Sequence, residues 1–379
     1  AETKAAKTWS YHHATDKEDL QVGNIWAGGR SLKECCPADV MPEYLEIEKK
    51  LQAFNMAFGA VDFNVQEWCV YDFMPLSFLI DLCEVKNKIT EYVSKNIEKP
   101  VRYDFYKHVS MMLEDISHKR VTVDKQRVSA YLQDPKLKHH AKNIIEAAPC
   151  VRYNQFGTKT GRLTTKKGCV PILTMNREFR SAVKPQNDYF IELDFNGAEV
   201  RTLLGLLGKE QPEGDVHDFH LKEIFTDIHT RDKAKIAFFA WLYGSRSAVI
   251  RQDVLKLAEF YEKDRLLKEY WDGNTVRTPF KKEIPDTSEH HALNYLVQST
   301  AAELTLKQAL KLEYLLRKQS AGSHIAFLIH DAIVIDMKKE DEHLLKSLVT
   351  LMSSTNFGNF MVNIKRGKTL GSMKDIQLG

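Results

Sequence analysis

The sequence lacks a long hydrophobic run and a secretion signal. No stretch of about eighteen apolar residues occurs in the chain, which argues against insertion into a membrane. The opening residues, AETKAAKTWSYHH, do not follow the charged-then-apolar layout of a signal peptide. We therefore expect an intracellular protein without a membrane partner.

Regular cysteine spacing is also absent. The six cysteines include no CxxC pair and recur at no fixed interval, so neither a zinc site nor a disulfide framework is indicated. We expect reduced thiols at all of these positions, which are Cys35, Cys36, Cys69, Cys83, Cys150 and Cys169.

A strong charge of one sign is missing as well. The 54 basic residues nearly balance the 51 acidic residues, and the formal net charge is +3. A nucleic-acid contact would therefore need local clusters of Lys and Arg. The nucleotide-binding patterns GxxxxGK[ST] and GxGxxG, the zinc-protease pattern HExxH and the hydrolase pattern GxSxG are absent, which argues against the sites that these patterns form.

What the chain does contain is enough apolar sequence for a large core. Its 379 residues are 43% apolar, which allows one elaborate domain or roughly two to three subdomains. We expect irregular structure in residues 1–42. Amphipathic helices are expected in residues 43–132, where segments such as LIDLCEVKNKITEYVSKNI place apolar residues three and four apart.

A change of pattern near residue 150 predicts a domain boundary. The polar segment RYNQFGTKTGRLTTKKG begins at Arg152 and precedes DYFIELDF, an expected buried strand. Helical patterning follows over residues 199–267, then a polar turn, RTPFKKEIPD, and one long helix, HHALNYLVQSTAAELTLKQALKLEYLLRK. The segment IAFLIHDAIVIDM predicts two strands around a tight turn at His330 and Asp331.

Two aspartates lie in apolar, strand-like segments. Asp194 belongs to FIELDF and Asp331 to LIHDAIVI. Removing a carboxylate from water costs several kcal/mol unless a cation or hydrogen-bond donors compensate, so each aspartate needs a partner. A single aspartate at a strand end is more often a turn or cap residue. Whether the two aspartates form a functional pair must therefore be judged from the sequence between them.

That intervening sequence contains a helical stripe. The stripe consists of Arg231, Lys235, Phe239 and Tyr243, followed by Gly244. A step of four residues turns a helix by about 400°, so these side chains share one slowly drifting face. Cations at one end and aromatic rings at the other suit a nucleoside triphosphate. An amphipathic helix with a basic first turn is the alternative.

Several segments, in the same order, resemble the polymerase domain of the DNA polymerase I family (family A). The resemblance runs from about residue 155 to the C-terminus. The segments are TGRLTT at 160–165, DFNGAEVR at 194–201, DVH at 215–217, RDKAKIAFFAWLYG at 231–244, NYLVQSTAAEL at 294–304 and HDA at 330–332. Each segment is short, but their shared order makes the resemblance specific.

The resemblance implies an α+β fold of the right-hand polymerase type, with an antiparallel-sheet palm, helical fingers and a mostly helical, thumb-like N-terminal region. The expected divisions are residues 1–150 for the N-terminal region, 151–205 for the first part of the palm, 206–285 for the fingers and 286–379 for the second part of the palm. The implied function is template-directed DNA synthesis, in which dNTPs extend a primer 3′ end by a two-metal-ion mechanism. The N-terminal part is short and poor in paired acidic motifs, so we expect no 3′–5′ proofreading exonuclease.

The resemblance also implies the metal ligands. Asp194, Asp331 and the backbone carbonyl of Phe195 would hold two Mg²⁺ ions, which Mn²⁺ could replace. Because Ala332 stands where the family commonly has Glu, a third carboxylate is missing beside them. The two aspartates would then carry the metals with little redundancy.

The triphosphate ligands are implied in the same way. His217, Arg231 and Lys235 would bind the phosphates, and Lys235 is a candidate proton donor to pyrophosphate. Two other interpretations of His217 remain open. It fits a polar helix start, and its spacing from His220 is compatible with a metal pair.

Further residues are implied to contact the sugar, the template and the primer. Phe239 would pack on the deoxyribose and Tyr243 on the templating base, with core packing as the alternative for both. Glu199 would close the space beside the sugar C2′ and so exclude a ribose hydroxyl. Arg162 would contact minor-groove acceptors, which every base pair presents. The complete set implied to bind DNA is Arg162, Tyr243, Gly244, Asn294, Gln298 and His330.

The expected partners are primer–template DNA, dNTPs and replication proteins such as a helicase or a primase. In the first aspartate motif, Phe195 and Gly197 replace the common Tyr and Gln, and the fingers segment is shorter than usual. Nucleotide handling is therefore expected to differ from that of the family. A single-subunit RNA polymerase and a catalytically silent primer–template binder remain as alternatives.

Overall fold

The structure, a computed structural model, describes residues 22–61, 70–244 and 251–377. The chain divides into two compact units, Ala1–Met111 and Met112–Gly379. This division falls inside helix α4 (Tyr103–His118), upstream of the boundary expected near residue 150. The finer division into palm, fingers and thumb-like region stays a prediction.

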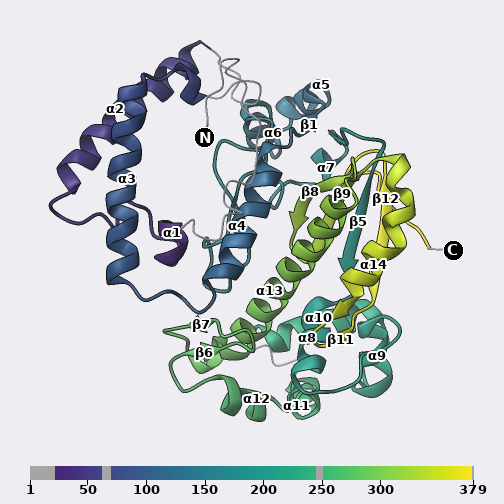
Figure 1. Cartoon of the computed structure of the whole chain (residues 1–379). Helices are drawn as coiled ribbons and strands as arrows, with labels where there is room; N and C mark the ends of the chain where they lie inside the picture. The colour runs from purple at the N-terminus through teal and green to yellow at the C-terminus, as the bar shows by residue number, and fades with distance from the viewer. Residues whose placement is uncertain (1–21, 62–69, 245–250, 378–379) are drawn as a thin grey trace. The chain divides into compact units, whose positions relative to one another are not determined.

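The first unit is helical in its described part. Its elements are α1 (Gly23–Trp26), α2 (Met41–Ala60), the 3₁₀ helix η2 (Val70–Phe73), α3 (Leu76–Asn96) and the start of α4. Helices α2 and α3 lie side by side (Figure 1). The buried side chains of α3 recur at intervals of three and four and are Phe78, Leu82, Val85, Ile89 and Val93. This periodicity confirms the predicted amphipathic helices.

The prediction of irregular structure over residues 1–42 is partly wrong. Residues 1–21 lie outside the described residues, but Gly23–Trp26 forms the short helix α1. Trp26 donates its indole N–H to the carbonyl of Ile97 over 2.8 Å. This contact is distant in sequence, which explains why local patterning gave no sign of the helix.

The second unit is built on a five-stranded sheet. Every neighbouring pair in the order β13-β12-β5-β9-β8 is antiparallel, and an α+β fold is therefore confirmed. The strands are β5 (Tyr189–Phe195), β8 (His324–Ile329), β9 (Ala332–Met337), β12 (Val362–Gly367) and β13 (Lys374–Asp375). Strand β5 and the β8–β9 hairpin agree with the sequence prediction, whereas β12 was not predicted.

Two helices contact this sheet. They are α13 (Glu289–Lys318), the predicted long helix, and α14 (Leu345–Ser353). The Gln308 side chain of α13 donates to the carbonyls of Leu351, Met352 and Ser354 at 2.6–2.9 Å. These bonds satisfy carbonyl groups that the end of α14 leaves without helical partners.

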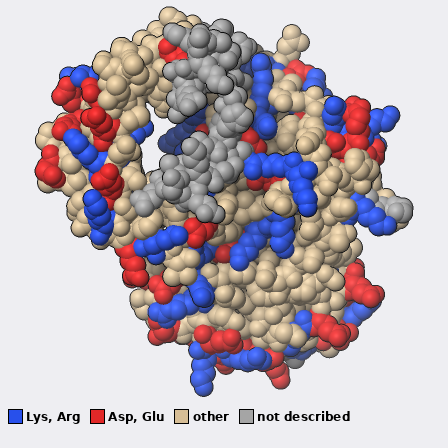
Figure 2. Space-filling model, viewed as in Figure 1, with Lys and Arg blue, Asp and Glu red and all other residues tan. Residues whose placement is uncertain are grey.

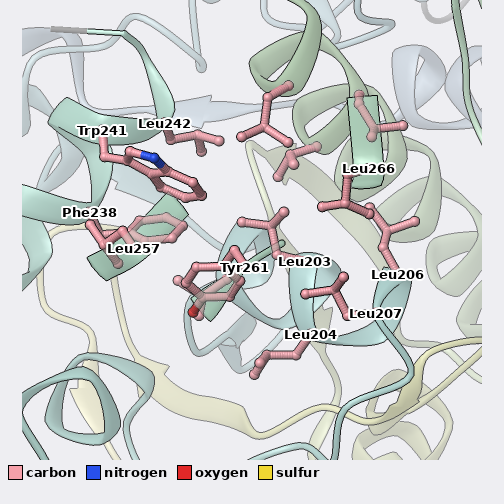
Figure 3. Close-up of a cluster of buried hydrophobic side chains, with 14 of the residues drawn as sticks. Leu203, Leu204, Leu206, Leu207, Phe238, Trp241, Leu242, Leu257, Tyr261 and Leu266 are labelled. Carbon is pink, nitrogen blue, oxygen red and sulfur yellow. The ribbon is translucent and has the colours of Figure 1, made fainter. Parts of the chain in front are cut away.

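A second group of helices forms its own core beside the sheet. Its elements are α8 (Ala198–Leu206), α9 (Val216–Glu223), α10 (Arg231–Leu242), α11 (Arg251–Phe260), α12 (Lys263–Tyr270) and the hairpin of β6 (Val276–Arg277) with β7 (Glu283–Ile284). Figure 3 shows leucines of α8 facing Phe238 and Trp241 of α10 and Tyr261. The expectation of a polar turn at RTPFKKEIPD is wrong in detail, because its ends pair as two strands of this hairpin.

Short elements connect these parts. They are β1 (Thr122–Val123), α5 (Lys125–Ser129), η3 (Ala130–Gln133), α6 (Lys138–Glu146), β2 (Tyr153–Asn154), β3 (Thr164–Thr165), α7 (Arg177–Arg180), β4 (Val183–Lys184), η5 (Lys339–Leu344), β10 (Ser354–Thr355) and β11 (Gly358–Asn359). Figure 2 shows both basic and acidic side chains on the visible face. Within the described residues, none of the helices combines the length and apolarity that crossing a bilayer requires.

Candidate active site

The two sequence-predicted aspartates lie at the same end of the sheet, one in a strand and one in the turn next to it. Asp194 lies near the end of β5, where it pairs with Ala332 of β9 on one side and Asn363 of β12 on the other. Asp331 lies in the two-residue turn that joins Ile329 to Ala332. The sheet thus positions both carboxylates by backbone pairing.

The turn itself has an unusual backbone. His330, its first central residue, has φ +55°, a conformation found in the tight turns that match the twist of paired strands. Its side chain is exposed, and the carboxylate of the next residue, Asp331, lines a cavity.

That cavity, of ≈ 220 Å³, brings together most of the predicted site. Its lining comes from β5, α8, α9, α10, the β8–β9 turn and β12. The lining residues are Asp194, Phe195, Asn196, Gly197, Ala198, Glu199, Asp215, His217, Arg231, Lys235, Phe239, Asp331 and Asn363. All residues predicted to bind metal and all those predicted to bind nucleotide, except Tyr243, are in this set.

The carboxylates of Asp194 and Asp331 are buried without enough nearby positive charge to offset the cost of burial. Burial, followed by the charge of Asp331 and that of Glu192, raises the pKa of Asp194 to about 6. Burial likewise raises the pKa of Asp331, although the charges of Arg162 and His330 act against this shift. Asn363 and Lys365 supply only part of the compensation at Asp194.

This donor set fits a divalent cation. Two carboxylates and a main-chain carbonyl at Phe195 are oxygen ligands of the kind that Mg²⁺ prefers. The described residues contain no group of three or more His, Cys, Asp or Glu side chains placed to hold a metal. That a cation would rest on Asp194 and Asp331 stays a prediction.

Another part of the cavity lining presents cations from the first turns of α10. Arg231 is held by an ion pair of 2.7 Å to Asp215. Lys235, one turn further along, is exposed and has no hydrogen bond or ion pair to any described residue. An unpaired ammonium group at the cavity is available to an anionic ligand.

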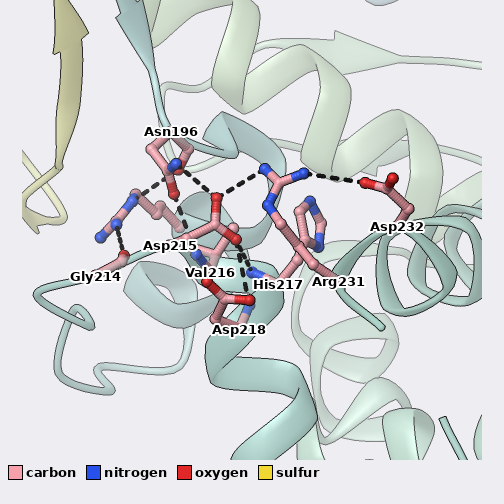
Figure 4. A network of polar contacts seen from close by, with 9 residues as sticks. Asn196, Gly214, Asp215, Val216, His217, Asp218, Arg231 and Asp232 are labelled. Carbon is pink, nitrogen blue, oxygen red and sulfur yellow. Dashed lines mark hydrogen bonds and ion pairs between the residues drawn. The ribbon is translucent and has the colours of Figure 1, made fainter. Parts of the chain in front are cut away.

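Asp215 joins three structural elements (Figure 4). It caps α9 by accepting from the backbone N–H groups of His217 and Asp218 at 2.9 and 3.2 Å. It also accepts from Asn196 at 2.9 Å and pairs with Arg231. Although burial alone would raise it, these hydrogen bonds hold the pKa of Asp215 well below its usual range.

The two histidines of α9 have different environments. His217 is buried at the cavity wall, and its Nδ1 has no hydrogen-bond partner among the residues that the structure describes. Burial lowers its pKa to about 4, so it is a neutral donor or acceptor at pH 7. His220 lies deeper, and its ring Nε2 is 2.6 Å from the Tyr261 hydroxyl, so this nitrogen is already engaged.

A second polar group lies at the start of α8. Glu199 is only 4% exposed. It pairs with Arg162 over 2.6 Å and accepts from the Tyr243 hydroxyl over 3.4 Å. Burial raises the pKa of Glu199 to about 7 even though Arg162 lowers it. The Tyr243 ring also stacks on Phe239, with centroids 5.6 Å apart.

The remaining sequence-predicted residues do not line the cavity. Gln298 reaches it indirectly through a hydrogen bond with Tyr243. Gly244 has φ +72°, and a β-carbon there would collide with the His290 ring. Asn294 lies one turn before Gln298 on α13, with its side-chain oxygen buried and unpaired. None of these three positions is part of the cavity lining.

Sequence reasoning missed three residues at the site. Asp215 could have been found, since an aspartate before a helix is a common N-cap. Asn196 and Asn363 gave no usable signal, because their partners Asp215 and Asp194 are set by tertiary pairing. Asp215 and Asn363 each contact a predicted ligand, Arg231 and Asp194 respectively, and Asn196 contacts Asp215.

Comparisons with known proteins find distant sequence relatives. No family profile matches the chain. It is 27% identical over 267 residues to "DNA polymerase I, thermostable" of Thermus filiformis, covering 58% of this chain and 31% of the relative. It is 25% identical over 243 residues to DNA polymerase I of Geobacillus stearothermophilus, covering 52% and 28%. A third relative, DNA polymerase I of Aquifex aeolicus, is 23% identical over 251 residues, covering 56% and 43%. The chain thus spans less than half the length of each relative.

A solved structure shares the fold. The "POL domain of Pol1 from M. smegmatis complex with DNA primer-template and dNTP" superposes with a TM-score of 0.62 at 13% identity, covering 78% of this chain and 76% of that one. The structural match extends further along the chain than the sequence matches. The structural match shows the fold of that domain, and the sequence relatives make the chain a distant homologue of the polymerase domain of DNA polymerase I (family A) over a little more than half of its length.

Proposed function

We propose that this chain is a template-directed DNA polymerase that extends a primer 3′ end with dNTPs. The observation that carries the proposal is the cavity in which Asp194 and Asp331 line one wall and Arg231 and Lys235 another. Phosphoryl transfer needs charge stabilisation on both sides of the transferred group, and this arrangement supplies anionic ligands for metals and cations for phosphates.

The carboxylate wall would hold the metals. When bound by Asp194, Asp331 and the Phe195 carbonyl, Mg²⁺ or Mn²⁺ would activate the primer hydroxyl and neutralise charge on the leaving pyrophosphate. Asn363 orients Asp194 by hydrogen bonding. Because Asp194 lies in a paired strand and Asp331 in the tight turn between two paired strands, the positions of the carboxylates need little adjustment when substrates bind.

The α10 wall would bind the triphosphate. Arg231 presents its guanidinium from a fixed position, since Asp215 holds one of its nitrogens. Lys235 brings a compact charge that can approach the β- and γ-phosphates and donate a proton to pyrophosphate. His217, neutral because it is buried, would donate a hydrogen bond rather than a charge.

The aromatic end of α10 would receive the sugar and base. Phe239 lines the cavity, and Tyr243 stacks on it while bonding Glu199. Glu199 would then narrow the space beside C2′ and favour deoxyribose. The residues proposed to bind primer–template DNA are Arg162, Tyr243, Gly244, Asn294, Gln298 and His330.

The proposed division follows from these roles. Residues 151–205 and 286–379 contain the sheet and would form the palm, residues 206–285 contain α9 to α12 and would form the fingers, and residues 1–150 would be thumb-like. The solved relative bound to primer–template and dNTP supports the same partners here. A helicase or primase as a partner and the absence of proofreading remain predictions, the latter tested by following loss of 3′ nucleotides from a labelled primer.

Primer extension with Mg²⁺ tests the proposal. We expect the parent chain to extend a labelled primer on a defined template, and Asp194→Asn and Asp331→Asn to lose almost all extension. Asp227→Asn, a change at an exposed carboxylate away from the cavity, is the matched control and should behave like the parent. Equal extension by all four proteins would contradict the mechanism, and extension by none of them would favour the silent binder.

The preference for dNTPs or rNTPs distinguishes the proposed DNA polymerase from the remaining alternative, an RNA polymerase. A single-subunit RNA polymerase would prefer rNTPs, whereas the proposed enzyme should prefer dNTPs. Glu199→Ala should raise rNTP incorporation relative to dNTP by at least about tenfold, a loss of roughly 1.4 kcal/mol of discrimination. An unchanged ratio would remove the proposed role of Glu199 without affecting the roles of the aspartates.

A further inference from the structure

Two cysteines that the proposed function does not use lie in contact. The Sγ atoms of Cys150 and Cys169 are 3.7 Å apart. Five cysteines fall in the described residues, and this is the one pair among them whose sulfur atoms are in hydrogen-bonding contact. Their sequence separation gave no hint of the contact, since it follows no recognised spacing.

The backbone explains why the sulfurs meet. Cys150 precedes β2 and Cys169 follows β3, and these strands pair antiparallel. Hydrogen bonds continue beyond the strands, from Val170 N–H to the Cys150 carbonyl at 3.0 Å and from Ala148 N–H to the Gly168 carbonyl at 2.8 Å. The two cysteines are therefore held together by the main chain on either side of the sulfur contact.

The two thiols differ in access. Cys150 is 5% exposed, whereas Cys169 is half-buried. Burial and the neighbouring Cys169 raise the pKa of the Cys150 thiol to about 11, so Cys150 stays protonated at neutral pH. A soluble oxidant would therefore meet Cys169 first, and Cys150 would resolve the product.

We propose that Cys150 and Cys169 form a reversible disulfide bond with each other. The oxidant is a low-molecular-weight disulfide such as oxidised glutathione, so the pair is a redox modification site. The Cys169 thiolate attacks one glutathione sulfur, a mixed disulfide forms and one glutathione thiolate leaves. Cys150 then loses its proton and attacks the Cys169 sulfur, and the second glutathione leaves. Two protein thiols are oxidised, and one oxidised glutathione is reduced to two thiols.

The disulfide would join the two ends of a segment, residues 151–168, that extends to the candidate active site. Residues 151–168 carry Arg162, which bonds Glu199, and Tyr153, whose hydroxyl bonds the backbone of Leu328 in β8. Disulfide closure requires the sulfurs to approach to roughly 2.05 Å. The bond would join the two ends of this segment covalently.

Peptide mapping tests the proposal on the full chain. The reduced protein is exposed to oxidised glutathione, the remaining thiols are alkylated, and the digest is analysed by mass spectrometry. We expect a peptide pair joined through Cys150 and Cys169, lighter by two hydrogen atoms than the separate thiol peptides, which dithiothreitol separates. Recovery of both cysteines in alkylated form, or of Cys169 only as its glutathione adduct, would overturn the proposal.

Variants connect the bond to stability. Oxidation should raise the melting temperature of the parent chain by roughly 5 °C and should have the same effect on Cys83→Ser, a change at an exposed cysteine. Cys169→Ser and Cys150→Ala should show no rise. If oxidation raised the melting temperature of either variant, the stabilisation would have to come from another thiol. Neither readout uses nucleotide incorporation, so failure here is distinguishable from failure of the proposed function.

Discussion

The two walls of the candidate active site are built in different ways. Asp194 lies in a strand whose backbone pairs with both neighbours, and Asp331 lies in the tight turn between two paired strands. Arg231 and Lys235 come from the exposed start of a helix, where only Arg231 has a fixed partner, Asp215. The sheet fixes its ligands through the main chain, whereas the helix relies on side-chain contacts.

This difference has an energetic consequence. Both carboxylates have raised pKa values because they are buried with little compensating charge. A bound cation would supply that charge and would stabilise the ionised carboxylates. Exposed cations on α10 lose little solvation and can adapt to a ligand. We therefore expect substitutions of the aspartates to abolish the reaction and substitutions on the helix wall to weaken it by graded amounts.

The largest effect on the helix wall is expected at Lys235. Lys235→Ala removes the unpaired charge at the cavity, and nucleotide incorporation in a single turnover should slow by about 100-fold. Lys233→Ala changes an exposed lysine of the same helix that does not line the cavity and serves as the matched control. Equal rates for the two variants would show that the charge at position 235 is not used.

A smaller effect is expected at Asp215. Asp215→Asn keeps a side chain that can cap α9 but removes the charge that holds Arg231. The KM for dNTP should rise about tenfold, with a smaller change in kcat. Asp218→Asn, in the same helical turn but exposed, should leave KM unchanged. A parental KM in Asp215→Asn would mean that Arg231 needs no positioning partner.

The smallest effect is a pH dependence of stability near Glu199. Burial raises the pKa of this carboxyl from 4.5 to about 7, so the folded chain binds more protons there than the unfolded chain between these values. Its contribution to stability is present below about pH 4.5 and is lost as pH rises through about 7.

Thermal unfolding without divalent cations measures this contribution. The melting temperature of the parent should fall by about 5 °C more between about pH 5 and pH 8 than that of Glu199→Gln, which cannot ionise. Glu210→Gln, at an exposed glutamate, should follow the parent. If the melting temperatures of Glu199→Gln and the parent change with pH in parallel, the titrating group is not Glu199.

Much of the fold and of the site could be predicted from the sequence. The apolar run around Asp194 and the hairpin at Asp331 are local patterns, and both are strands as expected. The four-residue spacing on α10 brought Arg231, Lys235 and Phe239 to one cavity. Periodicity and burial are properties of neighbouring residues, so they can be read along the chain.

The rest depends on contacts between distant segments. Asn363 meets Asp194 only because β12 pairs with β5, and Arg231 meets Asp215 across a gap of sixteen residues. The contact of Cys150 with Cys169 follows from the pairing of β2 with β3. No local pattern specifies these three pairs, and the first two of them contact predicted ligands.

The central claim is that Asp194 and Asp331 together hold the catalytic divalent cation. Titration of Mn²⁺ into the full chain, followed by electron paramagnetic resonance of the free ion, measures this directly. The parent and Asp227→Asn should bind Mn²⁺, and Asp194→Asn and Asp331→Asn should each bind it at least about tenfold more weakly. Unchanged binding in both substituted proteins would contradict the account.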